Sequence, residues 1–455
     1  MAGLFMRGQM LKEESAEEKS PSDFKELCRL VREEFLLKMG ESEGSMAEEL
    51  ELQKKAIVGY EDAVSRFKEK IGEILAEKGC ADCAFPSYHS DLISAIYHEN
   101  WGLSGIAPWF GEKYKESSSA KIIGDRIYFL ENGTMLKQPQ TISKERREQL
   151  VRALLLLSPD ERMDKSFHEL YLLDGTRVTI FRGSMTKEGQ DVMIFRRYIV
   201  PRLSFEEQAE RGTIPAEAIS LFKDMVRLGY NVAFTGAVRT AKTTFLSTWQ
   251  SYEDPKLEGV MVETDPEVPL HKIQPAAPIV QILADEDRLL TVTKNLLRSD
   301  ADYMIMAEAR EGTALDTVLK MASKGTRRLK ITFHTKDPAD FPYDVAGEVV
   351  KSMGGDLKYT ASKAAASFDY IFHFVQLKDK SKKRLKSIYE SGCDRKSGEI
   401  KLKRICEYDF KSDSWSWNYH ISEDKRTAGE EEDMDAFLSF ESGLRRLAGE
   451  SERGA

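Results

Sequence analysis

Lys242 and its neighbours have the residue types and the spacing of a phosphate-binding loop. The largely apolar segment 231–235 runs into Gly236, and Lys242 begins a helix-compatible segment six residues later. In such a loop the backbone N–H groups and the positive end of the helix surround phosphate oxygens. The lysine meets the β- and γ-phosphates, and the following threonine hydroxyl holds Mg²⁺. The sequence therefore predicts a site for ATP and Mg²⁺, with Thr243 as the metal ligand, built from Gly236, Ala241, Lys242, Thr243 and Thr244.

The loop departs from the usual pattern at Ala241. The pattern G-x-x-x-x-G-K-[ST] reads G-x-x-x-x-A-K-T here, and no glycine lies between Gly236 and Lys242. A methyl group at position 241 would crowd the phosphates or restrict a backbone conformation that glycine reaches freely. The alternative interpretation is an ordinary strand-to-helix turn that contains Lys-Thr-Thr. Hydrolysis is therefore less firmly predicted than nucleotide binding.

Three later apolar segments, 259–262, 302–307 and 329–333, each run into a polar residue. In open parallel sheets, ligands bind beyond the carboxyl ends of the strands. Each polar residue alone has an ordinary interpretation as a solvated loop residue or a helix cap. Together they favour a nucleotide site at one edge of a sheet. The four strand ends carry, in chain order, Lys242, Glu263, Glu308 and His334.

The elements that would position these residues follow from apolar periodicity. One apolar stripe over 46–78 predicts a single amphipathic helix. A strand over 121–130, a helix over 143–157, a hairpin turning at Asp174-Gly175 and a strand over 192–200 predict a mixed α/β domain. Strands and helices then alternate, which is typical of a parallel α/β sheet. The predicted parts are a charged helical extension 1–85, an α/β domain 86–205, a nucleotide-binding domain 206–375, a strand-rich subdomain 376–422 and a polar tail 423–455 with a short helix, partly disordered.

The composition limits the possible partners and compartments. The formal net charge is −9, which argues against a dedicated nucleic-acid binder, and no stripe of basic and aromatic residues supports a DNA-translocating relative. No apolar run approaches the roughly 18 residues of a membrane span, and residues 1–20 lack the apolar stretch of a secretory signal. Five scattered cysteines predict no disulfide framework, and the lone pair Cys80 and Cys83 is interpreted as two reduced thiols rather than a zinc site. The chain is therefore predicted to be cytoplasmic.

The order of these motifs resembles the ATPases of the type II and type IV secretion superfamily, and most closely the Tad (Flp) pilus branch. The resemblance covers roughly residues 100–415. Glu263 and Glu267 match the two glutamates of one family motif, although Thr264 departs from it, and Ala307 stands where the family usually has glycine. The other matching segments are 102–108, 161–164, 174–177, 194–198, the loop at 236–244, 302–316 and 332–334.

The resemblance implies a fold and a set of residue roles. The fold would be α/β, a RecA-like P-loop ATPase core with a smaller α/β N-terminal domain and a charged helical N-terminal extension. ATP would bind between the two domains and between adjacent subunits. Glu263 and Glu308 would polarise the attacking water, and His334 would sense the nucleotide state. The arginines that would meet the γ-phosphate charge are Arg177, Arg196, Arg197 and Arg310.

The function implied is an ATP-hydrolysing hexameric motor that powers pilus assembly or protein secretion. Its partners would be its own copies in a ring and an inner-membrane platform protein, so the chain would lie at the inner face of the cell membrane. No nucleic acid is expected. Ala241 supports an alternative: a catalytically weak nucleotide-binding paralogue that acts as an assembly or regulatory subunit of the same machinery.

Overall fold

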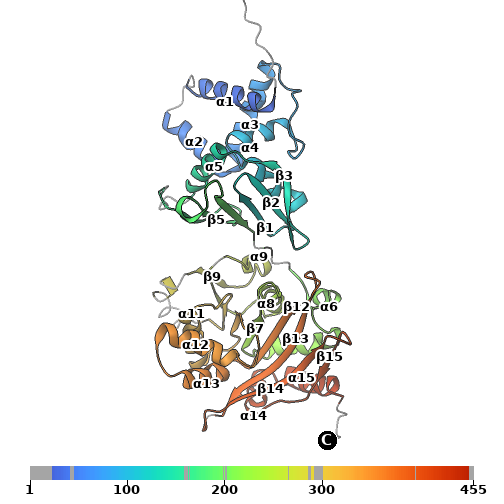
Figure 1. Cartoon of the computed structure of the whole chain (residues 1–455). Coiled ribbons are helices and arrows are strands. Elements are labelled where there is room, and N and C mark those ends of the chain that lie inside the picture. Colours follow the sequence, from blue (N-terminus) through green and yellow to red (C-terminus); the bar gives the residue numbers. More distant parts are fainter. Residues whose placement is uncertain are drawn as a thin grey trace, which may run out of the picture. The chain divides into compact units, whose positions relative to one another are not determined.

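The computed structural model divides into two compact units, Met1–Arg197 and Tyr198–Ala455. Figure 1 labels the helices and strands of both units. Each unit has its own core and is described by itself below. The structure describes residues 23–40, 46–157, 162, 164–197, 199, 202–264, 266–284, 288–289, 291, 301–394 and 396–449.

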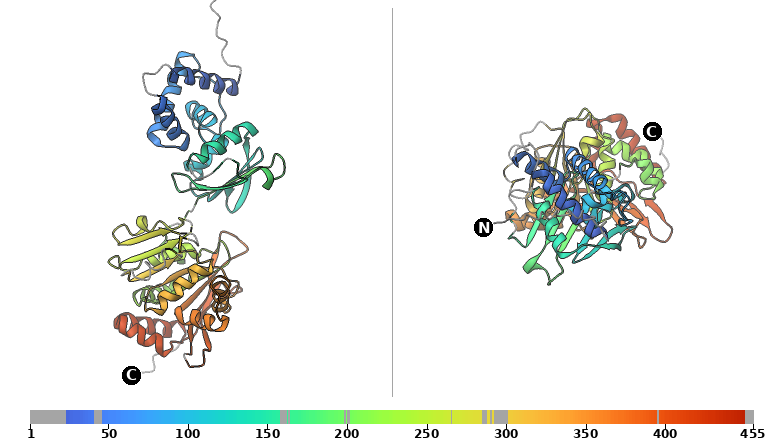
Figure 2. Two further views of the ribbon diagram at one scale, coloured as in Figure 1. Left: turned by 90° about the vertical axis from the view of Figure 1, so that its left-hand side faces the viewer. Right: turned by 90° about the horizontal axis from the view of Figure 1, so that it is seen from above.

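Four helices form one end of the first unit, and Figure 2 shows them gathered beside the sheet of the same unit. Their apolar faces meet around Phe35, Phe67 and Trp101, whose rings lie 4.6–5.6 Å apart. The single helix predicted over 46–78 is wrong, because Gly59 takes a φ of 98° and breaks the chain into two helices. The helices are α1 (Phe24–Gly40), α2 (Met46–Val58), α3 (Glu61–Glu77) and α4 (Leu92–Asn100).

The sheet of the first unit is antiparallel, with the strand order β3-β2-β1-β6-β5-β4. Residues 121–130 do not form one strand as predicted, because Gly124 has a φ of 61° and turns the chain into a hairpin. The predicted helix is α5 (Lys144–Leu155), capped by Ser143 as expected, and the predicted hairpin forms around Asp174-Gly175. The strands are β1 (Ser119–Ile123), β2 (Arg126–Glu131), β3 (Thr134–Thr141), β4 (Phe167–Tyr171), β5 (Arg177–Phe181) and β6 (Val192–Arg196).

The second unit is built on one nine-stranded sheet of order β15-β14-β13-β12-β7-β11-β10-β8-β9. Six neighbouring strands, from β12 to β9, are parallel, and β13, β14 and β15 continue the sheet in antiparallel fashion. The parallel strands are β7 (Val232–Gly236), β8 (Gly259–Glu263), β9 (Ile279–Leu283), β10 (Tyr303–Met306), β11 (Lys330–Phe333) and β12 (Tyr370–Gln376). The others are β13 (Lys383–Cys393), β14 (Ile400–Asp409) and β15 (Ser414–Trp417).

Helices cover both faces of this sheet, so its central strands are buried on two sides. Along β7, Val232 and Phe234 belong to one core and Ala233 to the other, as the alternation of side chains along a strand requires. The helices that contribute to the first of these cores are α7 (Ile219–Arg227), α8 (Lys242–Gln250) and α15 (Met434–Leu447). Those that contribute to the second are α11 (Gly312–Ser323), α12 (Phe341–Met353) and α13 (Leu357–Ser367).

Residues 423–447, for which the sequence predicts a polar tail with one short helix, form two helices, α14 (Glu423–Glu432) and α15. The aromatic side chains of α15, Phe437 and Phe440, are fully buried in the same core as α7 and α8. Residues 450–455, predicted to be disordered, lie outside the described residues.

The predicted fold class is confirmed. The second unit is an α/β, RecA-like P-loop core, and the smaller α/β unit with its helical extension precedes it. Among the described residues, no helix combines the length and the apolar character needed to cross a bilayer.

Candidate nucleotide-binding site

The loop between β7 and α8 leaves the sheet at Gly236. This residue has a φ of 137°, and a Cβ atom here would collide with the carbonyl oxygen of Phe374 on the neighbouring strand β12. Within the loop, the hydroxyl of Thr240 donates to the carbonyl oxygen of Ala237 at 2.9 Å. Only glycine therefore fits at the start of the loop, which bends sharply over the end of the sheet.

Ala241 occupies the left-handed region of backbone conformation, with a φ of 75° and a ψ of 21°. It is the residue just before the first turn of α8, where the usual pattern has glycine. Arg239 in the same loop is also left-handed, with a φ of 64°. The loop keeps a conformation that suits glycine while two L-residues with side chains occupy it. Thr244 lies in the first turn of α8, and its carbonyl accepts a bond from Thr248 at 3.1 Å.

Lys242 is the first residue of α8, and it is only 6% exposed. Its Nζ donates to the carbonyl oxygen of Ala237 at 2.8 Å and lies 3.4 Å from Nδ1 of His334. It forms no ion pair with any carboxylate that the structure describes. Burial lowers the pKa of the Lys242 ammonium to about 8, although Glu308 and Glu267 act to raise it. A buried cation held by neutral partners favours an anion beside it.

Glu308 follows β10 by two residues, and its negative charge acts to raise the pKa of Lys242. Its Oε1 pairs with Arg310 and lies 3.7 Å from Nε2 of His334. Its Oε2 is buried and has no hydrogen-bond partner among the described residues. Burial acts to raise the pKa of the Glu308 carboxyl, but His334 and Arg310 outweigh it and lower the pKa below its ordinary value.

His334, directly after β11, stands between Lys242 and Glu308. Since an ammonium can only donate, Nδ1 of the ring must accept from Lys242, and Nε2 then carries the proton that faces Glu308. The three side chains form one chain of polar contacts across the ends of three strands. An anion that drew Lys242 away would therefore change the contact between His334 and Glu308.

The two glutamates after β8 differ in their contacts. Oε1 of Glu263 accepts from the backbone N–H groups of Glu267 and Val268, both at 3.0 Å, so this oxygen holds the segment that follows the strand. Glu267 in turn places Oε2 3.4 Å from the hydroxyl of Thr243 at the start of α8. Sequence reasoning noted the spacing of four between the glutamates but did not include Glu267 among the site residues.

Two cavities lie near the carboxyl ends of the parallel strands, and the larger one borders the loop. One of about 100 Å³ lies between Glu263 and Glu308, with Arg310 also in its wall. The other, of about 660 Å³, is lined by the loop residues Ala237 and Val238 and by residues after β11 and along β12. The larger volume is within the range of small-molecule sites.

The residues present fit a phosphate group and a magnesium ion. The unpaired buried ammonium of Lys242 and the start of α8 suit an anion. The hydroxyl of Thr243 and the carboxylate of Glu267 are hard oxygen donors, which is the chemistry that Mg²⁺ prefers.

The three predicted arginines of the smaller domain lie in the first unit. Arg177 and Arg196 are directly opposite each other on β5 and β6. The Arg197 guanidinium lies 4.1 Å from the centre of the Trp109 ring and donates to the carbonyl oxygen of Trp109 at 3.2 Å. Their approach to a nucleotide stays a prediction, as do the catalytic roles of Lys242 and its neighbours.

The fold and the loop define a P-loop unit of the RecA-like type. No family model matches the sequence, and no curated protein matches it. Solved structures that resemble it include the ATPase DotB of Yersinia pseudotuberculosis, at 16% identity and a TM-score of 0.44, covering 73% of this chain and 82% of that one. The pilus retraction motor PilT with bound ADP matches at 14% identity and a TM-score of 0.44, covering 73% and 88%. The VirB11 ATPase of the Brucella suis type IV secretion system, in complex with sulphate, matches at 15% and 0.34, covering 63% and 92%.

These neighbours are secretion and pilus ATPases by their own descriptions. Identities of 14–16% and TM-scores of 0.34–0.44 are too low to transfer a function. The geometry around Lys242 carries the functional proposal.

Proposed function

We propose that the second unit binds ATP with Mg²⁺ at the loop 236–244 and hydrolyses it. The observation that carries the proposal is the chain of contacts from Lys242 through His334 to Glu308, in which the buried ammonium has no carboxylate partner among the described residues. A bound phosphate would supply the missing negative charge.

Each residue has a task that follows from its position. The backbone of the loop and Lys242 would hold the phosphates, while Thr243 and Glu267 would hold the metal ion. When bound, Mg²⁺ would neutralise charge on the phosphate oxygens. Oε2 of Glu308, which lacks a partner among the described residues, would accept the proton of a water molecule. Oε1 stays fixed by Arg310 and His334, so the carboxylate keeps its orientation.

We further propose, on the sequence resemblance, that the ATPase works as a ring-forming motor of a pilus or secretion system. Its ring would be a homo-oligomer, and the resemblance to the secretion ATPases implies a hexamer. The ring would dock on an inner-membrane platform protein from the cytoplasmic side. Arg177, Arg196 and Arg197 would contribute positive charge from the first unit.

A second candidate function is a nucleotide-binding subunit with little turnover. The left-handed Ala241 favours it, because a methyl group and a strained backbone stand where phosphate oxygens approach the loop. Both candidate functions include binding of ATP, and only the first includes its hydrolysis.

An assay of ATP binding and hydrolysis on four proteins separates the candidates. Lys242→Ala should lose binding and lower turnover by about 10²-fold or more, because it removes the cation at the phosphates. Glu308→Gln should keep binding and lose turnover to a similar extent. Lys272→Ala, an exposed lysine of the same unit, should match the parent chain.

The outcomes are decisive for each candidate. Binding by the parent chain without turnover supports the second function. Binding and turnover that are the same in Lys242→Ala as in the parent chain would refute both, because the nucleotide would then bind elsewhere.

A further inference from the structure

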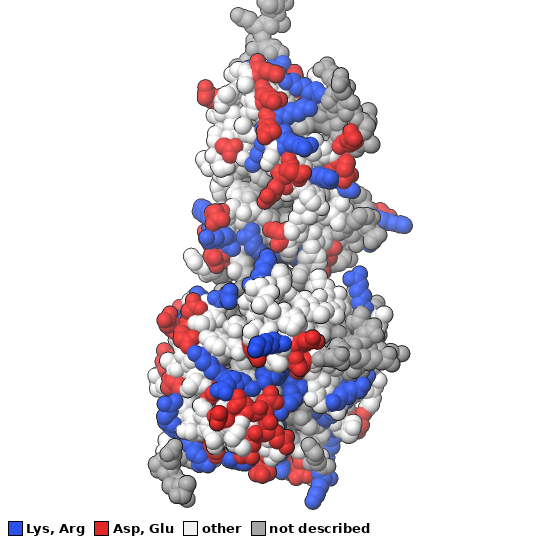
Figure 3. Space-filling model, turned by 180° about the vertical axis from the view of Figure 1, so that it is seen from behind, with Lys and Arg blue, Asp and Glu red and all other residues white. Residues whose placement is uncertain are grey.

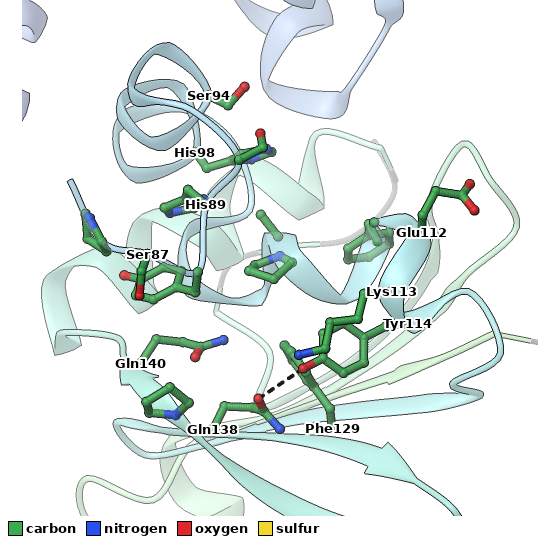
Figure 4. A pocket seen from close by; sticks show the side chains of 18 of the residues that line it. Ser87, His89, Ser94, His98, Glu112, Lys113, Tyr114, Phe129, Gln138 and Gln140 are labelled. Carbon is green, nitrogen blue, oxygen red and sulfur yellow. Dashed lines mark hydrogen bonds between the residues drawn. The ribbon is translucent and has the colours of Figure 1, made fainter. Parts of the chain in front are cut away.

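A cavity of about 890 Å³ opens in the first unit, and none of its described lining residues belongs to the phosphate loop. Figure 4 shows it from close by. The segment 86–90 and α4 line one side, and strands β2 and β3 line the other, together with the 3₁₀ helices at Ser104–Phe110 and Glu112–Tyr114. All lining residues belong to the first unit, and the volume suits a small organic ligand.

Two buried polar atoms of this cavity have no hydrogen-bond partner in the described part of the chain. They are Nε2 of His89 and Oε1 of Gln140, on residues that are 8% and 4% exposed. Figure 4 shows both side chains at the cavity, on opposite sides of it. The other end of the Gln140 amide is fixed, since its Nε2 donates to the carbonyl oxygen of Gly105 at 3.0 Å. The carbonyl oxygen of Gln140 is thereby held as an acceptor without a donor, which is unfavourable unless a ligand provides one.

Planar side chains surround these two atoms. The rings of His89 and His98 are parallel within 5° at a centroid distance of 5.8 Å. Tyr114 and Phe129 meet edge to face at 4.8 Å on the opposite side of the cavity. Burial lowers the pKa of His89 to about 4 and that of His98 to about 3. Both rings are therefore uncharged near neutral pH and present flat faces and single N–H groups to a ligand.

The charged residues of the cavity wall are mostly basic. Lys68 donates from Nζ to the hydroxyl of Ser94 at 2.9 Å, which brings its ammonium to the α4 side of the cavity. Lys113 is exposed on the other side, with Nζ 4.9 Å from the centre of the Tyr114 ring. Glu112 is the one carboxylate among the described lining residues. Two cations against one anion favour a ligand with a negative group.

We propose that this cavity binds a small molecule with a planar nitrogen heterocycle and an anionic substituent, the chemistry of a nucleoside monophosphate. A ring N–H of the ligand donates to Oε1 of Gln140, and Nε2 of His89 bonds a second polar atom of the ligand. The rings of the wall stack on the heterocycle, and Lys68 or Lys113 meets the anion. The described lining of this cavity shares no residue with the loop 236–244, and binding here does not depend on the proposed ATPase activity.

Calorimetric titration of the full chain with AMP and with GMP tests the proposal. The titrations use a Lys242→Ala background, so that binding at the phosphate loop does not contribute. We expect saturable binding of at least one nucleotide, weaker binding of adenosine or guanosine, which lack the phosphate, and none of ribose 5-phosphate, which lacks the ring.

Two substitutions then assign the binding to the cavity. His89→Phe and Gln140→Leu should each weaken binding by about tenfold or more, because each removes a polar partner. His168→Phe is the matched control, since His168 is a buried histidine of the same unit on β4 and does not line the cavity. It should bind as the parent does.

A thermal melt without ligand gives the second measurement. A histidine retained for a ligand leaves the melting midpoint unchanged or raised when phenylalanine replaces it, since the lone buried nitrogen is removed. A clear fall of the midpoint in His89→Phe would mean that the histidine serves the fold and would overturn the proposal. It is equally overturned if neither nucleotide binds at millimolar concentration, or if both substitutions leave binding unchanged.

Discussion

At the scale of single residues, the electrostatics of the loop depends on the positive charge of Lys242, which no carboxylate among the described residues pairs with. The ammonium is buried against a carbonyl oxygen and a neutral imidazole nitrogen, while the acidic groups that act on its pKa, Glu308 and Glu267, bond to other partners. A buried charge without an opposite charge is unfavourable, and an incoming phosphate removes that penalty. The unpaired ammonium of Lys242 therefore lowers the stability of the unliganded loop and raises its affinity for an anion.

Ala241 provides a direct test of the strain in this loop. Ala241→Gly should raise the free energy of unfolding by about 1 kcal/mol, because glycine adopts a positive φ without the clash of a Cβ atom. It should also raise the affinity for ATP, since the methyl group leaves the phosphate side of the loop. Denaturant unfolding and a binding titration measure the two effects.

Ala237→Gly is the control for that prediction. Ala237 lies in the same loop but is not among the residues with a positive φ, so glycine there relieves no strain and only adds freedom to the unfolded chain. We expect its stability to be unchanged or slightly lower. A gain in stability equal to that of Ala241→Gly would mean that the left-handed conformation is not the cause.

The sequence predicted residues of this site where their chemistry is visible in the residue type. Glu308 and His334 closely follow apolar strands, Lys242 begins the helix after another, and the structure brings all three together. Glu267 was missed because its approach to Thr243 depends on how Glu263 folds the following segment back. The lone polar atoms of His89 and Gln140 could not be predicted either, since only packing decides whether a buried atom finds a partner.

At the scale of elements, the site exists because three parallel strands end at the same edge. Strand β11 lies between β7 and β10, so His334 stands between Lys242 and Glu308 in space although it comes last in the chain. The chain between β7 and β11 forms β8, β9 and β10, which lie in the sheet on the side of β11 opposite to β7. The order of the strands in the sheet thus sets the order of contacts in the site.

Gly236 ties the loop to this sheet. Gly236→Ala should lower stability by several kcal/mol and abolish ATP binding, because the new Cβ atom would collide with the carbonyl oxygen of Phe374 and force β7 and β12 apart. Gly347→Ala is the matched control. Gly347 lies exposed within α12 with open space around its Cα, so alanine there should raise stability by about 0.5–1 kcal/mol.

Chemical denaturation of both glycine variants gives the comparison. Opposite signs are expected for the same chemical change at the two positions. Equal effects would show that the close approach of β12 to the loop does not govern the stability of this region.

The pattern of apolar residues along the sequence predicted the buried strands well, but it did not predict where one element ends and the next begins. Strands β7, β8, β10 and β11 are buried throughout, and their sequences are largely apolar, although β11 begins with the buried Lys330. Gly59 and Gly124 each turn the chain inside a periodic segment, and a glycine in such a pattern does not by itself show whether it bends the backbone. The sequence placed one short helix within a polar tail, whereas α15 spans Met434–Leu447 and buries Phe437 and Phe440 in the core.

At the scale of the whole molecule, each unit carries its own core and its own candidate site. The face drawn in Figure 3 has Lys and Arg side chains interspersed with Asp and Glu over both units. A mixed surface of this kind, together with a net charge of −9, is unlike the continuous basic face that nucleic acids require.

Light scattering coupled to size-exclusion chromatography tests the ring. With ATP and Mg²⁺ we expect a mass about six times the 51.7 kDa of the chain, because each nucleotide would be shared between neighbouring subunits. Lys242→Ala should stay at a lower mass under the same conditions. A monomer at every nucleotide concentration would remove the ring from the proposal and leave the nucleotide site untouched.

Helix α15 has a consequence for the integrity of the nucleotide site. The ring centres of Phe440 and Tyr230 lie 5.9 Å apart, and Tyr230 comes shortly before β7, the strand that leads into the loop. A protease cut near Asp433 that released α15 would therefore open the core beneath the loop, although the cut lies some two hundred positions away along the chain. The cleaved chain would therefore lose affinity for ATP although every side chain of the proposed phosphate site is still present.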